Sequence, residues 1–160
     1  MVKLSLQEMP IGTVAIAESG GWITNLYFQQ DTLPHDAERC ETALIREAFR
    51  QLHGYLQGEL HEFTLPFAPA GTPFMQRVWD MLFNIPYGAT ASYKEVAIAI
   101  GNPRAVRAVG MANQRNPLPL FIPCHRVVGS DGSLTGYRGG VALKQALLEL
   151  ERSTLAHLPQ

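Results

Sequence analysis

A short stretch rich in proline and glycine divides this sequence of 160 residues into two halves of different character. It runs from Pro66 to Pro73 and reads Pro-Phe-Ala-Pro-Ala-Gly-Thr-Pro. Proline and glycine at this density interrupt both helices and strands, so we do not expect a regular element to continue through the stretch. The sequence therefore predicts two domains, one over residues 1–69 and one over residues 70–160.

The half before this stretch carries signals for strands and for one helix. Thr13–Ala17 and Trp22–Phe28 are β-prone apolar runs, and the Glu-Ser-Gly-Gly between them favours a hairpin. Apolar residues on one helical face predict a helix from Asp36 to about Gln57. Phe63–Phe67 is a candidate for a further strand. We therefore expect a small sheet accompanied by one helix.

The half after the stretch carries mainly helix signals. Thr72 before a proline is typical of a helix start, and Ser92 with Glu95 three residues later has the capping-box pattern. The helix that follows Ser92 is expected to stop at Gly101, and another is expected from Arg104 to about Asn113. Two short helices joined by a tight turn make a helix-turn-helix candidate.

The remainder of the second half contains a non-helical segment and a last helix. Residues 116–123 include three prolines and cannot form a helix. A final helix is expected from about Val141 to Arg152. The fold class that follows is α+β, with a small N-terminal β-sheet and helix domain and a mainly helical C-terminal domain that contains the helix-turn-helix.

Charge is distributed unequally between the two halves. The net charge of the chain is -1, but residues 1–69 carry four lysines and arginines against nine aspartates and glutamates, which gives −5. Residues 70–160 carry nine against five, which gives +4. Such asymmetry is compatible with a polyanionic partner for the second half, while ordinary solvated surface is the simpler alternative.

The sequence also bears on location and on cofactors. Its first residues lack the sustained apolar run and cleavage site of a signal peptide, and no run approaches the roughly 20 apolar residues that span a bilayer. We therefore expect a cytoplasmic protein whose two cysteines, Cys40 and Cys124, are free thiols. Because neither CxxC nor HExxH occurs, we expect no metal and no cofactor.

Pro-Cys-His-Arg-Val-Val, at residues 123–128, gives the strongest indication of chemistry. A cysteine reacts as its thiolate, and a thiol with an ordinary pKa near ~8.5 is mostly protonated at neutral pH. We expect His125 to act as the base that keeps Cys124 ionised, and Glu151 to orient the imidazole. For a Cys-His pair taken alone, a buried structural cysteine beside a surface histidine is the alternative interpretation.

The surroundings of this segment favour the functional interpretation. Together with them it resembles the methylated-DNA–protein-cysteine methyltransferase family, also called the O6-alkylguanine-DNA alkyltransferases. The resemblance covers roughly residues 71–152, and the first 70 residues match only in general character. The matching motifs are Gly71-Thr-Pro-Phe74, Ile85-Pro-Tyr-Gly88, Ser92-Tyr93, Gly101-Asn-Pro-Arg-Ala-Val-Arg-Ala-Val-Gly110, Asn116-Pro-Leu-Pro and Gly136-Tyr-Arg-Gly-Gly140.

The resemblance implies a role for each catalytic position. Cys124 would be the alkyl acceptor, His125 the base that acts through a water, and Glu151 the residue that holds the imidazole ring. Asn116 would link the DNA-reading helix to the active-site loop. Tyr93 would contact the guanine ring as proton donor.

The resemblance also implies how DNA and the damaged base are bound. Arg107 would be the arginine finger that occupies the gap left by a flipped nucleotide. The other expected DNA contacts are Arg104, Ala105, Ala108, Asn113 and Ser92. The expected pocket residues for the base are Val127, Tyr137, Arg138 and Gly139. Arg138 is large and basic, so it could add a phosphate contact or narrow the pocket, and the sequence does not determine which sizes of alkyl group fit.

These inferences predict a DNA repair protein that transfers an alkyl group irreversibly from flipped O6-alkylguanine, with O4-alkylthymine left open, to Cys124. Its partner would be double-stranded DNA, without a membrane or an obligate protein partner. We expect a monomer, with clustering along DNA left open. The alternatives are a non-catalytic binder of alkylation damage, an acyl-transfer enzyme with a Cys-His-Glu triad, and a transcriptional regulator. The presence of Cys124 argues against the damage binder.

Overall fold

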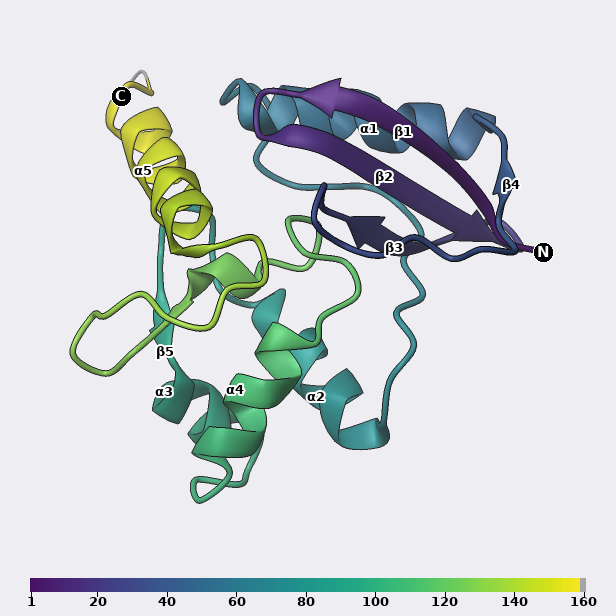
Figure 1. The fold of residues 1–160 in the computed structure, drawn as a ribbon. Coiled ribbons are helices and arrows are strands. Elements are labelled where there is room, and N and C mark those ends of the chain that lie inside the picture. The colour runs from purple at the N-terminus through teal and green to yellow at the C-terminus, as the bar shows by residue number, and fades with distance from the viewer. Residues whose placement is uncertain (159–160) are drawn as a thin grey trace. The chain divides into compact units, whose positions relative to one another are not determined.

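The chain folds into two compact units, Met1–Ala70 and Gly71–Gln160, in a computed structural model that describes residues 1–158. Figure 1 shows the first unit in purple and blue, and the second in teal, green and yellow. The first contains a sheet and a helix, and the second is mainly helical. The predicted α+β fold class is confirmed.

A four-stranded sheet in the order β3-β2-β1-β4 forms the centre of the first unit, with one helix, α1, against it (Figure 1). The strands β1, β2 and β3 are antiparallel neighbours, whereas β4 runs parallel to β1. The elements are β1 Lys3–Met9, β2 Gly12–Ser19, β3 Trp22–Tyr27, β4 Glu38–Arg39 and α1 Ala43–Leu56.

The predicted hairpin is present, and the sheet extends beyond it. Gly20 and Gly21, both with positive φ, turn the chain between β2 and β3. The sequence analysis did not predict β1, although Lys-Leu-Ser-Leu-Gln-Glu-Met alternates apolar and polar residues at its start, as a half-buried strand does. Phe63–Phe67 is not a strand, since only an isolated bridge joins Phe67 to Ile23.

The helix of the first unit begins later than predicted. Asp36 lies in a turn, and Glu38 and Arg39 pair with β1, so residues 36–42 are not helical. The helix starts after Thr42, whose Oγ1 accepts a hydrogen bond from the Ile45 amide at 3.1 Å. Strand pairing with a distant segment therefore outweighed the local helical pattern.

Within residues 71–158, the second unit contains three longer helices, two short ones and a two-stranded sheet. Thr72 and Ser92 cap helices as predicted, and Ser92 forms both halves of a capping box with Glu95. The elements are α2 Pro73–Leu82, β5 Ala91–Ser92, α3 Tyr93–Ala99, α4 Val106–Gln114, the 3₁₀ helix η1 Cys124–Arg126, β6 Val127–Val128 and α5 Val141–Ala156.

Two of these boundaries differ from the prediction. Helix α4 begins at Val106, so Arg104 lies in the turn before it, not on its first turn. Asn102 and Ala105 close that turn with a backbone hydrogen bond of 3.0 Å. Helix α5 continues to Ala156, beyond the predicted end at Arg152.

Two long-range contacts hold the second unit together around its centre. Trp79 of α2 is buried, and its Nε1 donates to the Ala112 carbonyl of α4 at 2.9 Å. The parallel pair β5–β6 joins Ala91 to Val127 and Ser92 to Val128. This pairing places the start of α3 beside the end of the segment that contains Cys124.

The helices of residues 1–158 are all too short or too polar to span a membrane. Over the same residues, no group of three or more His, Cys, Asp or Glu side chains is placed to hold a metal ion.

Replacing Ser92 by alanine tests how α3 is fixed. The change removes the hydroxyl that accepts from the Glu95 amide at 3.0 Å, so the free energy of unfolding should fall by about 1 kcal/mol. Urea denaturation of the wild type and the variant measures the difference. Ser130→Ala, in an exposed loop, is the control and should leave stability unchanged. Equal stability of all three proteins would contradict the capping role.

Candidate active site

Cys124 is the first residue of η1 and is only 3% exposed. Its amide donates to the Ile122 carbonyl at 2.7 Å, which keeps the chain tightly turned before the cysteine. Both polar atoms of the Asn116 side-chain amide bind the loop that precedes Cys124. Its Nδ2 donates to the Ile122 carbonyl at 3.0 Å, and its Oδ1 accepts from the Leu118 amide at 2.9 Å. Asn116 thus fixes the loop that delivers the cysteine.

His125 and Glu151, which the sequence analysis paired, lie together in the interior. Their side chains are fully buried, and His125 Nε2 lies 2.7 Å from Glu151 Oε2. An ionised carboxylate only accepts hydrogen bonds, so Nε2 carries the hydrogen and Nδ1 is the basic nitrogen of the ring. The pair thus has the arrangement of a base oriented by an acid.

Arg126 takes part in the same cluster, which the sequence analysis missed. Its Nε donates to Glu151 Oε1 at 2.9 Å and its Nη2 to Oε2 at 3.0 Å. Its Nη1 donates to the Ile85 carbonyl at 2.8 Å, and its guanidinium lies 5.7 Å from the centre of the Tyr87 ring. The sequence signal that could have indicated this role is an arginine between apolar residues in Pro-Cys-His-Arg-Val-Val, where a buried charge needs a partner.

Gly88 completes the environment of the carboxylate. Its amide donates to Glu151 Oε1 at 2.9 Å, and its backbone has φ +84. A Cβ at this position would collide with the side chain of Leu155. Only glycine therefore fits where the chain must turn and bring an N–H to Glu151.

Burial of this site shifts the pKa values of Cys124 and His125 in opposite directions. Burial raises the pKa of the Cys124 thiol, against the effects of the Asn116 hydrogen bond and the charges of Lys144 and Arg138. Burial lowers the pKa of His125, against the effect of Glu151. Burial thus favours a thiol at Cys124 and a neutral imidazole at His125, whereas the sequence analysis expected a cysteine held ionised by its base.

Tyr93 and Lys144 meet at one carbonyl of the loop that follows β6. The Tyr93 hydroxyl donates to the Thr135 carbonyl at 3.1 Å, and the Lys144 Nζ donates to the same oxygen at 3.0 Å. Burial raises the pKa of Tyr93, so its phenol is protonated and able to donate. Lys144, which is 0% exposed, was not among the predicted site residues.

The residues predicted to form the pocket for the base differ in how far they are exposed. Val127 and Tyr137 are buried, and Gly139 is half-buried. Arg138 is half-buried and its Nη2 donates to the Asn116 carbonyl at 3.4 Å, so its guanidinium reaches the loop that delivers the cysteine.

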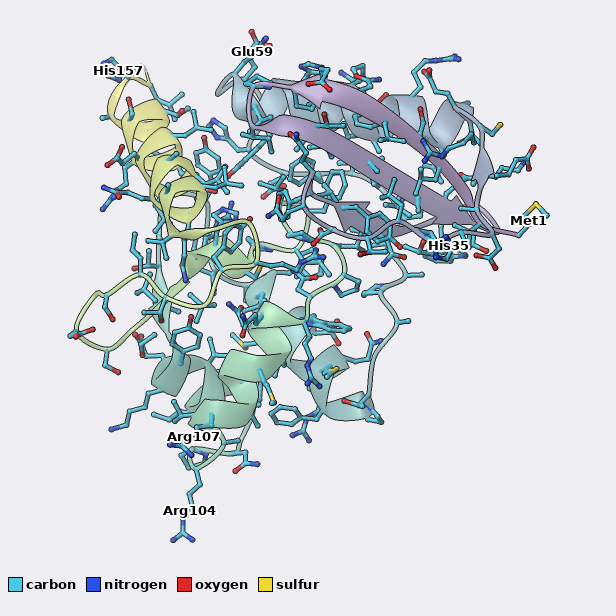
Figure 2. All side chains as sticks on the ribbon, viewed as in Figure 1. Met1, His35, Glu59, Arg104, Arg107 and His157 are labelled. Carbon is cyan, nitrogen blue, oxygen red and sulfur yellow. The ribbon has the colours of Figure 1, made fainter. Side chains whose placement is uncertain are left out.

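The predicted DNA contacts divide into exposed and buried residues. Arg104 and Arg107 project from the end of the second unit that carries the turn before α4 (Figure 2), and Ala108 is exposed beside them while Ala105 is half-exposed. Asn113, in contrast, is 2% exposed. Its Nδ2 donates to the Cys124 carbonyl at 3.2 Å, which ties α4 to the cysteine.

The side chains of two residues that were expected to contact DNA are therefore directed into the protein. Asn113 lies on the inner face of α4, since the period of the helix turns that position toward the core. Ser92 is 8% exposed, and its hydroxyl is used to cap α3.

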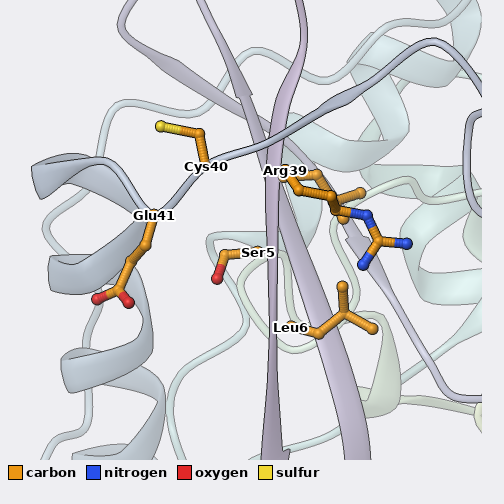
Figure 3. Close-up of a pocket in the computed structure, with 6 residues that line it drawn as sticks. Ser5, Leu6, Arg39, Cys40 and Glu41 are labelled. Atoms are coloured by element: carbon orange, nitrogen blue, oxygen red, sulfur yellow. The ribbon is translucent and has the colours of Figure 1, made fainter.

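The second thiol has a different environment. Cys40 lines a pocket beside β1 and β4 in the first unit, where its sulfur and the guanidinium of Arg39 point in opposite directions (Figure 3). Glu41 and Ser5 line the same pocket. Among the six lining residues there is no histidine to act as base, so the features that mark Cys124 are not repeated here.

Both units match models of one protein family. Residues 73–153 match "6-O-methylguanine DNA methyltransferase, DNA binding domain", and residues 2–69 match "6-O-methylguanine DNA methyltransferase, ribonuclease-like domain".

Individual relatives agree with these matches over nearly the whole chain. The methylated-DNA–protein-cysteine methyltransferase of Methanosarcina barkeri is 47% identical, covering 92% of this chain and 96% of its own length. The constitutive enzyme of Bacillus subtilis is 46% identical, covering 91% and 92%. The crystal structure of Mycobacterium tuberculosis OGT in complex with DNA is 45% identical with a TM-score of 0.90, covering 95% of this chain and 94% of that one. The chain therefore belongs to the 6-O-methylguanine DNA methyltransferase family, as the sequence motifs predicted.

Proposed function

We propose that this protein repairs O6-alkylguanine in double-stranded DNA by irreversible transfer of the alkyl group to Cys124. The observation that carries the proposal is a buried cysteine beside a His125–Glu151 pair, in a unit whose helix-turn-helix exposes two arginines. The names of the relatives, and the DNA bound to the Mycobacterium tuberculosis structure, support the same reaction and partner.

DNA binding begins at the exposed turn and first residues of α4. The alkylated atom lies inside the stacked duplex, so the nucleotide must turn out of the helix to reach a buried sulfur. Arg107 is exposed on the first turn of α4 and long enough to occupy the gap that remains. Arg104, in the turn before the helix, supplies positive charge for the phosphates.

Transfer requires one proton to move and one carbon to change partners. The thiol proton of Cys124 passes to Nδ1 of His125 through a water, while Glu151 stabilises the imidazolium. The sulfur then forms a bond to the alkyl carbon as the bond from that carbon to O6 breaks, and the electron pair of that bond stays with guanine. Tyr93 exchanges the Thr135 carbonyl for the base, protonates it, and regains a proton from the imidazolium through solvent.

The product is a thioether and an unmodified guanine. The DNA supplies the alkyl group and the protein supplies the accepting sulfur and the proton, so the reaction needs no further reactant. None of the assigned residues is placed to cleave a thioether, and one molecule therefore repairs one lesion. The cytoplasmic location and the monomeric state remain predictions from the sequence.

Cys124→Ala is the direct test of the acceptor. Wild-type protein mixed with duplex that carries O6-methylguanine should gain the mass of one methyl group per molecule, and the variant should gain none while still binding the duplex. Intact-protein mass spectrometry and a gel-shift assay measure the two properties. Cys40→Ser should behave like the wild type, and methylation of the Cys124→Ala protein would refute the assignment.

Arg107→Ala separates nucleotide flipping from the transfer step. Repair of duplex should slow by about tenfold, the effect of losing about 1.4 kcal/mol of the few kcal/mol that flipping costs. Reaction with free O6-alkylguanine base should keep its wild-type rate, because no nucleotide has to leave a stack. Arg152→Ala, an exposed change on α5, is the control. Equal slowing with duplex and free base would remove the finger role.

Glu151→Gln tests the buried cluster through both stability and rate. The change leaves the guanidinium of Arg126, whose side chain is 10% exposed, without its carboxylate, so the free energy of unfolding should fall by about 3 kcal/mol. Methyl transfer should slow as well, since the imidazolium loses its stabilising charge. Denaturation and single-turnover kinetics measure these effects, with Glu149→Gln on the exposed side of α5 as control. Unchanged stability would contradict the ion pair.

A further inference from the structure

The side chain of Asn113 has one polar atom that the protein itself does not use. Asn113 lies on the inner face of α4 and is 2% exposed. Its Nδ2 donates to the Cys124 carbonyl at 3.2 Å, whereas its Oδ1 accepts no hydrogen bond within residues 1–158. The carbonyl can only accept, so the nitrogen of the amide faces it and the oxygen is the free atom. A buried acceptor without a donor costs free energy, which a ligand that supplies the donor would recover.

This oxygen lies beside the groups that the proposed reaction brings to the base. Both polar atoms of the amide are bonded to one carbon, so Oδ1 is close to the backbone of Cys124. One turn earlier on the same face of α4, a Cβ at Gly110 would lie 3.9 Å from the ring of Tyr93. Helix α4 therefore runs from the phenol ring to the cysteine. Since Cys124 is 3% exposed, we expect the opening that admits a base to the sulfur to reach the neighbouring amide as well.

The two candidate bases differ in the hydrogens that they offer to such an acceptor. Alkylation of O6 removes the hydrogen from N1 of guanine, so the exocyclic amino group is the only N–H donor left on the base. The amino group and the alkylated O6 lie on the same edge, with N1 between them. Alkylation of O4 removes the hydrogen from N3 of thymine, and that base then has no N–H donor.

We propose that Oδ1 of Asn113 accepts a hydrogen bond from the amino group of an extruded O6-alkylguanine, and that Asn113 is in this way a specificity-determining residue. This inference rests on the proposed function and names its preferred substrate. A base whose alkyl carbon meets the Cys124 sulfur presents its amino group along the same edge, near the carbonyl that holds the Asn113 amide. O4-alkylthymine would leave the buried oxygen unpaired, and a site is selective against a substrate that lacks the required donor.

The experiment compares two duplexes that differ by this amino group alone. One carries O6-methylguanine, and the other carries O6-methylhypoxanthine, which is the same base without the amino group. Asn113→Leu and Asn113→Met remove both polar atoms, and Asn113→Asp keeps an acceptor. Asn84→Met, at an exposed asparagine after α2, is the matched control. The second-order rate constant of methyl transfer is measured by intact-protein mass for each protein with each duplex.

The quantity that tests the inference is the rate constant for O6-methylguanine divided by that for O6-methylhypoxanthine. In Asn113→Leu and Asn113→Met this ratio should fall by about tenfold, which corresponds to about 1.4 kcal/mol and to the loss of one hydrogen bond. Asn113→Asp and Asn84→Met should keep the wild-type ratio. Lost support for the Cys124 carbonyl would slow transfer from both duplexes alike, so a merely structural role does not change the ratio.

Two results would overturn the inference. One is a wild-type ratio in Asn113→Leu and Asn113→Met, because Asn113 would then only support the cysteine. The other is a ratio in Asn113→Asp as low as in Asn113→Leu, since the acceptor would then not be the cause. Thermal unfolding checks that each variant is folded, and either apolar variant answers the question if the other does not fold. Failure of the wild type to accept a methyl group would reject the proposed function, whereas a methylated wild type with unchanged ratios rejects the inference alone.

Discussion

The buried carboxylate of Glu151 is the interaction on which the rest of the active site depends. It accepts hydrogen bonds from His125, from Arg126 and from the backbone of Gly88, and so joins three segments that are far apart in the sequence. Burying an ion pair costs desolvation free energy, which this arrangement offsets by filling nearly all of the acceptor positions of the carboxylate. The cluster fixes the imidazole of His125 in one orientation and one tautomer.

This cluster lies beside a cysteine that is shielded from solvent. Burial raises the pKa of the Cys124 thiol and lowers the pKa of His125, which favours the uncharged forms of both, and a buried thiol is a poor target for solvent electrophiles. A protein that can use its cysteine only once benefits from this protection. The groups that can assist transfer from a base in the pocket are the basic nitrogen of His125 and the phenol of Tyr93.

Local signals predicted the elements that depend on local chemistry. The capping box at Ser92 and the Gly-Gly turn before β3 were identified because each uses residues only a few positions apart. The start of α1 was wrong, because residues 38 and 39 pair with β1, a contact across more than thirty positions. The first strand was missed although its start alternates apolar and polar residues, and its antiparallel pairing with the neighbouring strand β2 is what makes this half-polar run a strand.

For the site, the sequence by itself determined the chemical groups: a cysteine beside a histidine, a glutamate on the last helix, and arginines at the start of a helix-turn-helix. The tertiary structure decided their states and several of their partners. It made Asn113 a support for the Cys124 carbonyl, and it brought Arg126 to Glu151 and Lys144 to Tyr93. The physical reason is that burial and charge neighbours set a pKa and a hydrogen-bond partner, and both are properties of the packed interior, not of spacing along the chain.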